Sequence, residues 1–349
     1  MTSLYAHLSR ARRRYYAVRP ERRRWLGRPV ISVGNLSVGG SGKTPVVELL
    51  ARRLQTSGRR PSVLTRGYGR ADAVDGVVVV NDGTRICAGL ARAGDEPMML
   101  ARNLPGIVVM VCPDRYLAGR LAERRFACDV HVLDDGFQHL QLGRDVDLLL
   151  AGDEDIDRPR VLPAGRLREP LDAARQADAL LWTGPAGDPG SAASRLRVPV
   201  YFEVRRAAGK LYPAFAGGSP PPGARVVGLA AIARPRPFLD GLRTSGFDVV
   251  SEVIWPDHHR YSRRDVEHVR RAVAATGAAA VITTEKDLVR LVPLGPLPFP
   301  LAWQRLEVRI EPAGAFEAWL VERLQDADAG ARLQDADAGA AGRRGSPHG

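Results

Sequence analysis

The sequence predicts an α/β fold with two domains. The larger N-terminal domain has a parallel-rich sheet covered by helices, and the C-terminal domain is a smaller α/β/α unit. Between residues 29 and 184, short runs of apolar, β-branched residues alternate with helix-like stretches, which is typical of parallel sheets with crossover helices. A second alternating series begins near residue 225, after a glycine, serine and proline linker at 217–223. The length of 349 residues suits two domains of ordinary size.

The composition allows a core in each domain and carries a strong positive charge. Hydrophobic residues make up 45% of the chain, and the formal net charge is +12 at pH 7. This excess favours anionic partners such as acidic lipids, phosphorylated substrates or nucleic acid. Cys87, Cys112 and Cys128 follow no CxxC spacing, which indicates a reducing compartment and argues against a structural zinc site. We recognise no secretory signal, and no apolar run approaches the roughly 20 residues that span a bilayer.

Residues 1–28 form a distinct basic segment with an amphipathic pattern. Apolar side chains recur at helical spacing among arginines, and Pro20 should end the first helix. A basic helix with an aliphatic and aromatic stripe is typical of segments that lie on anionic membrane surfaces. Two alternatives stay open: a helix that packs on its own domain through Leu4 and Leu8, and a nucleic-acid-binding segment. The stripe consists of Leu4, Leu8, Ala11, Tyr15 and Val18.

A glycine-rich loop connects the first strand and helix of the large domain. An apolar run at 30–33 leads into the loop, and a helical pattern follows from Val46 onward. The loop ends in Gly-Lys-Thr, which is typical of a phosphate-binding P-loop between a strand and a helix. Its backbone N–H groups would hold phosphate, the lysine would reach the β- and γ-phosphates, and the threonine hydroxyl would bind Mg²⁺. The residues assigned to nucleotide binding are Ser37, Val38, Gly39, Gly40, Ser41, Gly42, Lys43 and Thr44.

Two details of this loop bear on the interpretation. Ser37 stands where the common motif has its first glycine, so the loop must turn with the three glycines that follow. The chain has three lysines against 48 arginines, so Lys43 indicates that a compact ammonium group is needed at this position. The alternative is an ordinary glycine turn before a helix. The sequence therefore predicts a P-loop NTPase-like kinase domain over residues 29–215.

The remaining elements of this domain follow from apolar runs and helical periodicity. We expect ligands at the carboxyl ends of the parallel strands. Between residues 185 and 224 the pattern is less regular. Strands are expected at 61–65, 77–80, 107–111, 130–133, 146–151 and 179–182, and helices at 96–104 and 115–125.

Acidic residues lie at the ends of two of these elements. Asp134 and Asp135 follow the strand at 130–133, which is the Walker B pattern that holds a metal ion directly or through water. The alternative for this Asp-Asp-Gly sequence is a simple turn. Asp95 and Glu96 precede Pro97, where one of them could cap a helix, serve as a catalytic carboxylate, or do both.

Residues 216–322 are expected to form the smaller domain and to contribute to the active site. His258 and His259 follow a predicted strand, and a polar surface role is the alternative to proton transfer. The run Thr-Thr-Glu-Lys-Asp at 283–287 is typical of a capped helix start. Strands are expected at 225–229, 248–253, 279–283 and 307–310, and helices at 237–244, 263–275 and 315–324.

The C-terminal tail, residues 323–349, contains a nine-residue duplication. Residues 323–331 are repeated as 332–340, and both copies are rich in alanine, aspartate and glycine without an apolar face. Such a composition cannot bury enough apolar surface to offset the cost of ordering the chain. We therefore expect this tail to be disordered.

Seven short motifs follow one another along the chain and carry a family resemblance. Together they resemble the motifs of the tetraacyldisaccharide 4′-kinases, the lipid A pathway kinases of Gram-negative bacteria, over roughly residues 4–322. Any one of them is weak, but seven in order are highly specific. They are the P-loop run ending in Gly42-Lys43-Thr44-Pro45, then Thr65-Arg66-Gly67-Tyr68-Gly69, Gly94-Asp95-Glu96-Pro97, Asp134-Asp135-Gly136-Phe137-Gln138-His139, Gly165-Arg166-Leu167-Arg168-Glu169, Asp257-His258, and Thr283-Thr284-Glu285-Lys286-Asp287.

The resemblance implies two α/β/α domains with ATP and Mg²⁺ between them. It implies transfer of the γ-phosphate to the 4′-hydroxyl of a tetraacylated disaccharide 1-phosphate, giving lipid IVA, by a peripheral enzyme on the cytoplasmic face of the inner membrane. By matching positions, Asp95 would be the base with His258 as its partner, and Lys43 would neutralise the phosphates. The metal or its water shell would be held by Thr44, Asp134, Asp135 and Glu169, and the site would be lined by Tyr68, Arg115 and His139.

Two other classes of function compete with this interpretation. A P-loop GTPase or metal-chaperone NTPase would carry an Asn/Thr-Lys-x-Asp motif for guanine, and residues 284–287 have the wrong order. A nucleic-acid-binding ATPase would interleave aromatic and basic residues, yet aromatic residues make up only 6% of the chain. We therefore expect a lipid-linked disaccharide and an anionic membrane surface as partners and no nucleic acid.

Overall fold

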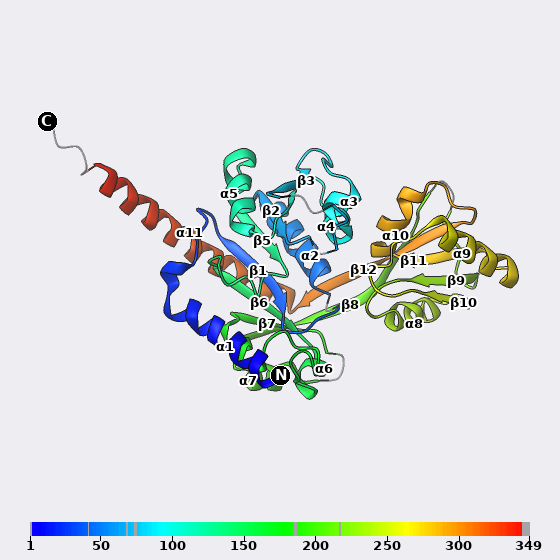
Figure 1. The fold of residues 1–349 in the computed structure, drawn as a ribbon, viewed down its shortest axis with the longest axis horizontal. Coiled ribbons are helices and arrows are strands. Elements are labelled where there is room, and N and C mark those ends of the chain that lie inside the picture. Colours follow the sequence, from blue (N-terminus) through cyan, green and yellow to red (C-terminus); the bar gives the residue numbers. More distant parts are fainter. Residues whose placement is uncertain are drawn as a thin grey trace.

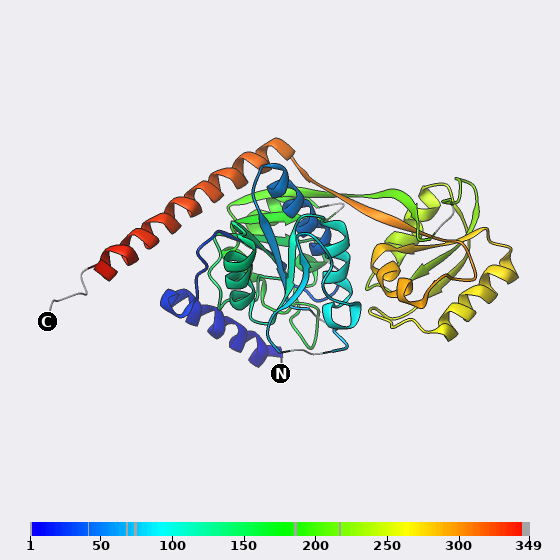
Figure 2. The same cartoon turned by 90° about the horizontal axis from the view of Figure 1, so that it is seen from above.

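The computed structural model describes residues 2–40, 42–67, 69–72, 75–184, 187–215 and 218–343. The chain forms two lobes joined by two long strands, as Figures 1 and 2 show. These strands, β8 (Val200–Pro213) and β12 (Leu301–Glu311), pair antiparallel. Within the described residues a single sheet of twelve strands therefore runs through both lobes, in the order β10-β9-β11-β12-β8-β7-β6-β1-β5-β2-β4-β3.

The large lobe contains the parallel sheet that the sequence predicts. Strand β1 lies between β5 and β6 and is parallel to both, whereas β3 pairs antiparallel with β4 at one edge. Strands β1, β5 and β6 are buried along their whole length, as expected for apolar strands covered on both faces. The strands of this lobe are β1 (Val30–Asn35), β2 (Pro61–Thr65), β3 (Val78–Asp82), β4 (Val108–Val111), β5 (Val130–Asp134), β6 (Val146–Ala151) and β7 (Ala179–Trp182).

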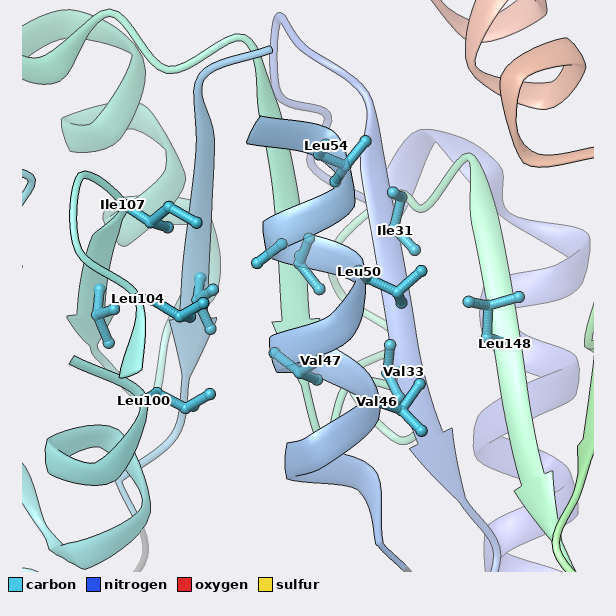
Figure 3. Close-up of a cluster of buried hydrophobic side chains, with 14 of the residues drawn as sticks. Ile31, Val33, Val46, Val47, Leu50, Leu54, Leu100, Leu104, Ile107 and Leu148 are labelled. Atoms are coloured by element: carbon cyan, nitrogen blue, oxygen red, sulfur yellow. The ribbon is translucent and has the colours of Figure 1, made fainter. Parts of the chain in front are cut away.

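Helix α2 (Lys43–Thr56) packs on the central strand directly after the glycine-rich loop. In Figure 3, Leu50 lies beside Ile31 and Val46 lies beside Val33. Burying a side chain of this size contributes about 1.5–3 kcal/mol, so this packing holds both ends of the loop in place. The other helical segments of the lobe are α1 (Thr2–Val18), α3 (Leu90–Ala93), α4 (Asp95–Asn103), α5 (Arg115–Phe126), α6 (Asp153–Asp157), α7 (Pro189–Leu196) and the 3₁₀ helices η1 (Pro20–Arg22) and η2 (Leu171–Gln176).

The small lobe repeats the same architecture on a smaller scale. Strands β9, β10 and β11 are parallel, and β11 pairs in parallel with the first half of β12. Thr284 caps the helix that follows β11, because its Oγ1 accepts a hydrogen bond from the backbone N–H of Asp287 (3.2 Å), and the capped helix start predicted there is confirmed. The elements are β9 (Arg225–Ala230), α8 (Arg236–Thr244), β10 (Asp248–Ile254), α9 (Arg263–Thr276), β11 (Ala280–Thr284), α10 (Glu285–Leu291) and the 3₁₀ helix η3 (Val292–Leu294).

Helix α1 lies along the large lobe (Figure 1). Arg13 is only 4% exposed, whereas Leu4 and Leu8 are 64% and 61% exposed. The helix ends before Pro20, as predicted. The alternative in which Leu4 and Leu8 pack on the domain is wrong, because the ion pair between Arg13 and Glu169 fixes the opposite face against the lobe. Among the described residues, no helix combines the length and apolar content needed to cross a membrane.

Strand β8 is the main element that the sequence pattern does not predict. It lies between the lobes, and most of its second half is exposed. Phe202 and Val204 are buried, but the adjacent Arg205 and Arg206 point to opposite faces of the strand, so the apolar alternation does not continue along its length. The segment at 185–224 therefore looks irregular in the sequence although it forms a 14-residue strand.

The boundary of the smaller domain differs from the predicted range 216–322. Ile310 of β12 and two residues of α11 (Ala313–Arg343), Phe316 and Leu320, are buried in the main core of the large lobe. The second half of β12 and helix α11 thus belong to the large lobe. The chain leaves the large lobe along β8 and returns to it along β12. No single boundary in the sequence therefore separates the two lobes.

The tail also differs from the expectation of disorder. Helix α11 continues through both copies of the duplicated sequence to Arg343. Leu324 is buried, and Arg59 donates a hydrogen bond from Nη1 to Asp328 Oδ2 (2.9 Å), so the first copy is tied to the large lobe. The alanines and arginines of the repeat favour helix, and the packed first turns of α11 supply the nucleus from which it extends.

Candidate active site

The glycine-rich loop lies between the carboxyl end of β1 and the first turn of α2. Gly39 and Gly42 have φ angles of 99° and 81°, a left-handed region that side chains other than glycine rarely adopt. Among the residues that the structure describes, no side chain caps the N-terminus of α2, and the first N–H groups and the dipole of a helix attract an anion. This geometry confirms the predicted strand, loop and helix order. Ser41 lies outside the described residues.

The first part of the loop serves a different purpose. Ser37 forms a β-bridge with Leu167, and the N–H of Val38 donates to the carbonyl oxygen of Arg166 (2.8 Å). These contacts hold the loop against the 166–168 segment and use the Val38 amide. We therefore expect phosphate to contact the later part of the loop, from Gly39 onward, rather than Val38.

Lys43 is held at the carboxyl ends of β1 and β5. Its Nζ donates to Asn35 Oδ1 (2.7 Å) and lies 3.2 Å from Asp135 Oδ1. Arg168 Nη1 donates to the other oxygen, Asp135 Oδ2 (2.6 Å). Burial raises the pKa of Asp135, but the charges of Lys43 and Arg168 outweigh it and keep that pKa below its usual value. Asp135 is therefore ionised, and two cations accompany it.

Asp134 ends β5 next to Val33 of β1 and is 3% exposed. Burial and the negative charges of Glu96 and Asp135 raise the pKa of Asp134 to about 7. A cation placed beside such a carboxylate would be strongly favoured, because it would remove the cost of burying the charge.

A magnesium ion fits the residues at this end of the sheet. In the part of the chain that the structure describes, no group of three or more histidine, cysteine or acidic side chains could hold a metal alone. Mg²⁺ usually keeps several waters and takes one or two carboxylates together with substrate phosphates. Asp134, Asp135 and the Thr44 hydroxyl at the start of α2 match that donor set.

Glu169 does not join this group. Arg13 binds both carboxylate oxygens of Glu169, with Nε 2.8 Å from Oε1 and Nη2 close to Oε2. Gln138 Nε2 donates to Oε2 (3.1 Å), and Ser9 Oγ donates to Oε1 (3.3 Å). The role of Glu169 at the metal or its water shell stays a prediction, and in this structure an arginine from the distant helix α1 binds its carboxylate.

This buried pair makes a testable contribution to stability. We expect Arg13→Gln to lower the free energy of unfolding by about 3 kcal/mol, because it leaves Glu169 buried without a cation. The matched control is Arg10→Gln on the same helix, which breaks an exposed pair with Asp172 (2.7 Å) and should cost less than about 1 kcal/mol. Urea unfolding followed by circular dichroism measures both, and equal losses would contradict the structural role of Arg13.

Asp95 and His258 meet across the two lobes. Asp95 begins α4 in the large lobe, and His258 lies in the loop after β10 with a φ of 62°. His258 Nδ1 lies 3.0 Å from Asp95 Oδ2, and Arg290 Nε lies 3.7 Å from the same oxygen. The structure therefore brings together the predicted base and its partner, which are 163 residues apart in the sequence.

The charges around this pair keep Asp95 ionised. Burial raises the pKa of Asp95, but the hydrogen bond from His258 and the charges of Lys286 and Arg290 outweigh it, so the pKa is lowered. The hydrogen bond to Asp95 raises the pKa of His258 above its usual value, although burial and Lys286 oppose this effect. A carboxylate that stays charged and lies 7% exposed can accept a proton from a nearby hydroxyl.

The Asp95–His258 pair and the phosphate loop each have a contact between the two lobes. A Cβ on Gly40 of the loop would lie 3.6 Å from Ala233 of the small lobe, and a Cβ on Gly69 would lie 3.8 Å from His258 Nδ1. Glu96, next to Asp95, influences the pKa of Asp134. The loop and the pair thus both lie where the two lobes meet.

Arg115 and His139, which were also predicted to line the site, are buried. Arg115 is buried and donates from Nη1 to the carbonyl of Pro113 (2.8 Å), and burial lowers its pKa to about 10. Burial and the charge of Arg115 lower the pKa of His139 to about 3, so this histidine is neutral. Arg115 is near enough to Asp134 and Asp135 to interact with both electrostatically. Tyr68 lies outside the described residues.

Three contributors to the site were not identified from the sequence. Asn35 ends β1 and binds Lys43, and a polar residue directly before a glycine-rich loop could have signalled it. Arg206 on β8 approaches the loop, since a Cβ on Gly42 would lie 2.8 Å from its Nη2. Arg290 reaches Asp95 from α10. No motif marks Arg206 or Arg290, because the fold brings them in from the other lobe or its connection.

Comparison with known proteins identifies the family of this site. A family described as tetraacyldisaccharide-1-P 4′-kinase matches residues 1–325. The chain belongs to this family. A tetraacyldisaccharide 4′-kinase of Geobacter sulfurreducens is 42% identical over 299 residues, which covers 83% of this chain and 82% of the relative. One from Syntrophus aciditrophicus is 37% identical over 322 residues, with 85% and 84% covered.

A solved structure agrees with the kinase in fold. The crystal structure of LpxK from Aquifex aeolicus in complex with ATP superimposes with a TM-score of 0.74 at 30% identity, and it covers 93% of this kinase and 97% of the Aquifex chain. The predicted resemblance to a lipid A pathway kinase is thus confirmed. The comparisons favour a kinase over the GTPase or metal-chaperone alternative.

Proposed function

We propose that this kinase transfers the γ-phosphate of ATP to the 4′-hydroxyl of a tetraacylated disaccharide 1-phosphate, giving lipid IVA. The observation that carries the proposal is the Asp95–His258 pair, which lies where the lobes meet, as does the phosphate-binding loop at the edge of the sheet where nucleotides bind in such folds. Family membership supports the substrate class, and the Aquifex relative with ATP supports the nucleotide.

The chain's own residues account for each requirement of phosphoryl transfer. The amides from Gly39 onward and the N-terminus of α2 hold the phosphates, and Lys43 shifts from Asn35 toward the charge that develops between the β- and γ-phosphates. Asp95 accepts the proton of the sugar hydroxyl as the hydroxyl oxygen attacks the γ-phosphorus, and the bond from that phosphorus to the β–γ bridging oxygen breaks, so that ADP leaves. Mg²⁺ bound by Thr44, Asp134 and Asp135 would neutralise further negative charge on the phosphates.

A transfer assay tests this proposal. Purified kinase is mixed with γ-labelled ATP, magnesium and the disaccharide 1-phosphate in detergent micelles, and the lipid fraction is separated and counted. We expect label in the lipid with ATP and little with GTP. Turnover of GTP without lipid labelling, or turnover stimulated by nucleic acid, would refute the assignment and favour the GTPase or nucleic-acid alternatives.

We further propose that the kinase acts as a peripheral enzyme on an anionic membrane surface, at the cytoplasmic face of the inner membrane of a Gram-negative cell. Support comes from α1, whose side chains Leu4, Leu8 and Val18 are more than 60% exposed and are surrounded by arginines. Such a face gains free energy by entering the headgroup region, and arginines add about 1 kcal/mol each on anionic lipid.

This attachment predicts a defined effect of surface substitutions. We expect Leu4→Ser with Leu8→Ser to weaken binding to anionic phospholipid vesicles at least about tenfold, because each loses the burial of an apolar side chain. Vesicle sedimentation measures the change. Ile254→Ser, which removes a 42% exposed side chain on the small lobe, is the control and should bind as wild type. Equal binding by the α1 variant would exclude this face as the attachment site.

A further inference from the structure

Lys286 is the centre of a charge cluster at the contact between the lobes. It lies in the first turn of α10, and its side chain is 17% exposed. Its Nζ lies 3.0 Å from Glu96 Oε1 of the large lobe, 3.2 Å from His258 Nε2 and 3.4 Å from Asp257 Oδ1. Glu96 belongs to helix α4, whereas Asp257 and His258 belong to the loop after β10. These three residues surround the single ammonium group of Lys286.

The chemistry of these groups decides where His258 carries its proton. A lysine ammonium has three N–H donors and no acceptor, so it must donate to His258 Nε2. That nitrogen therefore carries a lone pair, and the single proton of the neutral imidazole lies on Nδ1. Nδ1 is the atom that faces Asp95 Oδ2 at 3.0 Å, so the histidine donates to the carboxylate.

We propose that Lys286 is a positioning residue that keeps Nε2 of His258 unprotonated, so that a neutral imidazole donates from Nδ1 to the catalytic base Asp95. This inference rests on the proposed function of Asp95. A neutral partner orients Asp95 without cancelling its charge, whereas an imidazolium would make Asp95 a weaker base. Lys286 opposes the imidazolium because a proton on Nε2 would point at a positive charge 3.2 Å away.

The charged groups that face His258 act in opposite directions: Asp95 and Asp257 raise its pKa, and Lys286 limits that rise. Asp95 on α4 attracts the Nδ1 proton, and Asp257 on the same loop, 3.7 Å from Nε2, would attract a second proton. Lys286 on α10 repels that second proton and also neutralises Glu96. Arg290 on α10 adds positive charge near Asp95. Without Lys286, Asp257 and Glu96 would favour a doubly protonated His258.

The three groups around Lys286 Nζ explain why position 286 holds a lysine. The chain has three lysines and 48 arginines, yet a lysine occupies this site. Three acceptors around one nitrogen match the three donors of an ammonium group, and the planar fork of arginine does not match them. Arginine at position 286 would keep the charge and lose part of the hydrogen bonding.

Nitrogen NMR of the full-length kinase labelled with ¹⁵N-histidine tests the inference without an activity measurement. His258 is assigned by the signal that disappears in His258→Gln. In the wild type we expect a neutral His258 protonated on Nδ1 above its pKa. A wild-type signal protonated on Nε2 would overturn the inference, and this outcome needs no variant to fold.

The variant Lys286→Met extends the test to catalysis. We expect the His258 pKa to rise by about 1 unit or more, since a like charge within a few ångströms is removed. The acid limb of the kcat/KM profile should move to higher pH by a similar amount.

Two control variants accompany this test. Lys286→Arg should restore the position of the acid limb without restoring the full rate. Lys210→Met, at an exposed site on β8, should change neither the His258 pKa nor the acid limb. An unchanged His258 pKa in a folded Lys286→Met variant would refute the inference. Failure of the wild-type kinase to phosphorylate the lipid would instead refute the proposed function.

Discussion

Replacing Asp95 with asparagine lowers kcat by about 10²–10⁴, the loss expected when a general base is removed. The amide cannot take the proton of the sugar hydroxyl, although it keeps the size of the carboxylate and can still contact His258. Asp95 lies outside the phosphate-binding loop, so ATP should bind with nearly unchanged affinity. Steady-state transfer to the lipid acceptor and calorimetric titration with ATP measure the two quantities.

The pH dependence of this effect follows from the charges around Asp95. Its pKa is lowered, so the carboxylate is ionised at every pH above its usual value of about 3.9. Titration of Asp95 therefore does not produce the acid limb of the wild-type rate profile. The stability that its contacts contribute is present above that value and is lost as the pH falls through the lowered pKa.

Asp188→Asn is the matched control for the Asp95 variant. Asp188 caps α7 by accepting a hydrogen bond from the N–H of Ser191 (2.7 Å), and asparagine caps a helix about as well as aspartate. This variant should keep wild-type activity. Activity within a few fold of wild type in Asp95→Asn would remove Asp95 from the role of base.

Replacing Lys43 with methionine should lower kcat/KM for ATP by about 10²–10³ or more, which is the usual effect of removing one donor from a developing charge. The variant keeps most of the apolar stem and loses the ammonium group that contacts Asn35 and Asp135. Unlike Asp95→Asn, it should also weaken ATP binding, because Lys43 contacts the phosphates before and during transfer.

Lys210→Met controls for the loss of a lysine as such, because Lys210 is exposed on β8. We expect the Lys43 variant to fold, because Asp135 keeps Arg168 as a partner. A circular dichroism spectrum like that of the wild type would show this. Full transfer activity in the folded Lys43→Met variant would contradict the assignment of the loop as a phosphate site.

Local sequence patterns predicted most of the fold because the strands of the large lobe are apolar and short. The strands at 61–65 and 146–151 were confirmed with the same bounds, and the helical pattern after the glycine-rich loop was confirmed as α2. Strand β8 was not predicted, because most of its second half is exposed and the adjacent Arg205 and Arg206 place charges on both of its faces. The duplicated tail was expected to lack structure because it has no apolar face, yet its first copy is held by contacts of Leu324 and Asp328 with the large lobe.

The site could be predicted only in part for a related reason. The loop from Gly39 to Lys43 is a local motif, so its chemistry is readable from the residues. The pairing of Asp95 with His258 depends on how two lobes meet, and it came from the family resemblance. Arg13 binds Glu169 from a helix that lies more than 150 residues earlier in the chain. No local sequence pattern predicts such a contact. Lys286 appeared only as part of a capped helix start.

Analysis of the reaction product by ³¹P NMR and mass spectrometry tests the account most directly. The kinase is incubated with ATP, magnesium and the tetraacylated disaccharide 1-phosphate, and the lipid is extracted. We expect a lipid with two phosphomonoester signals, the new one coupled to the proton at the 4′ carbon, and no such product with Asp95→Asn or Lys43→Met. A product phosphorylated at another position, or release of inorganic phosphate with the lipid unchanged, would contradict the account.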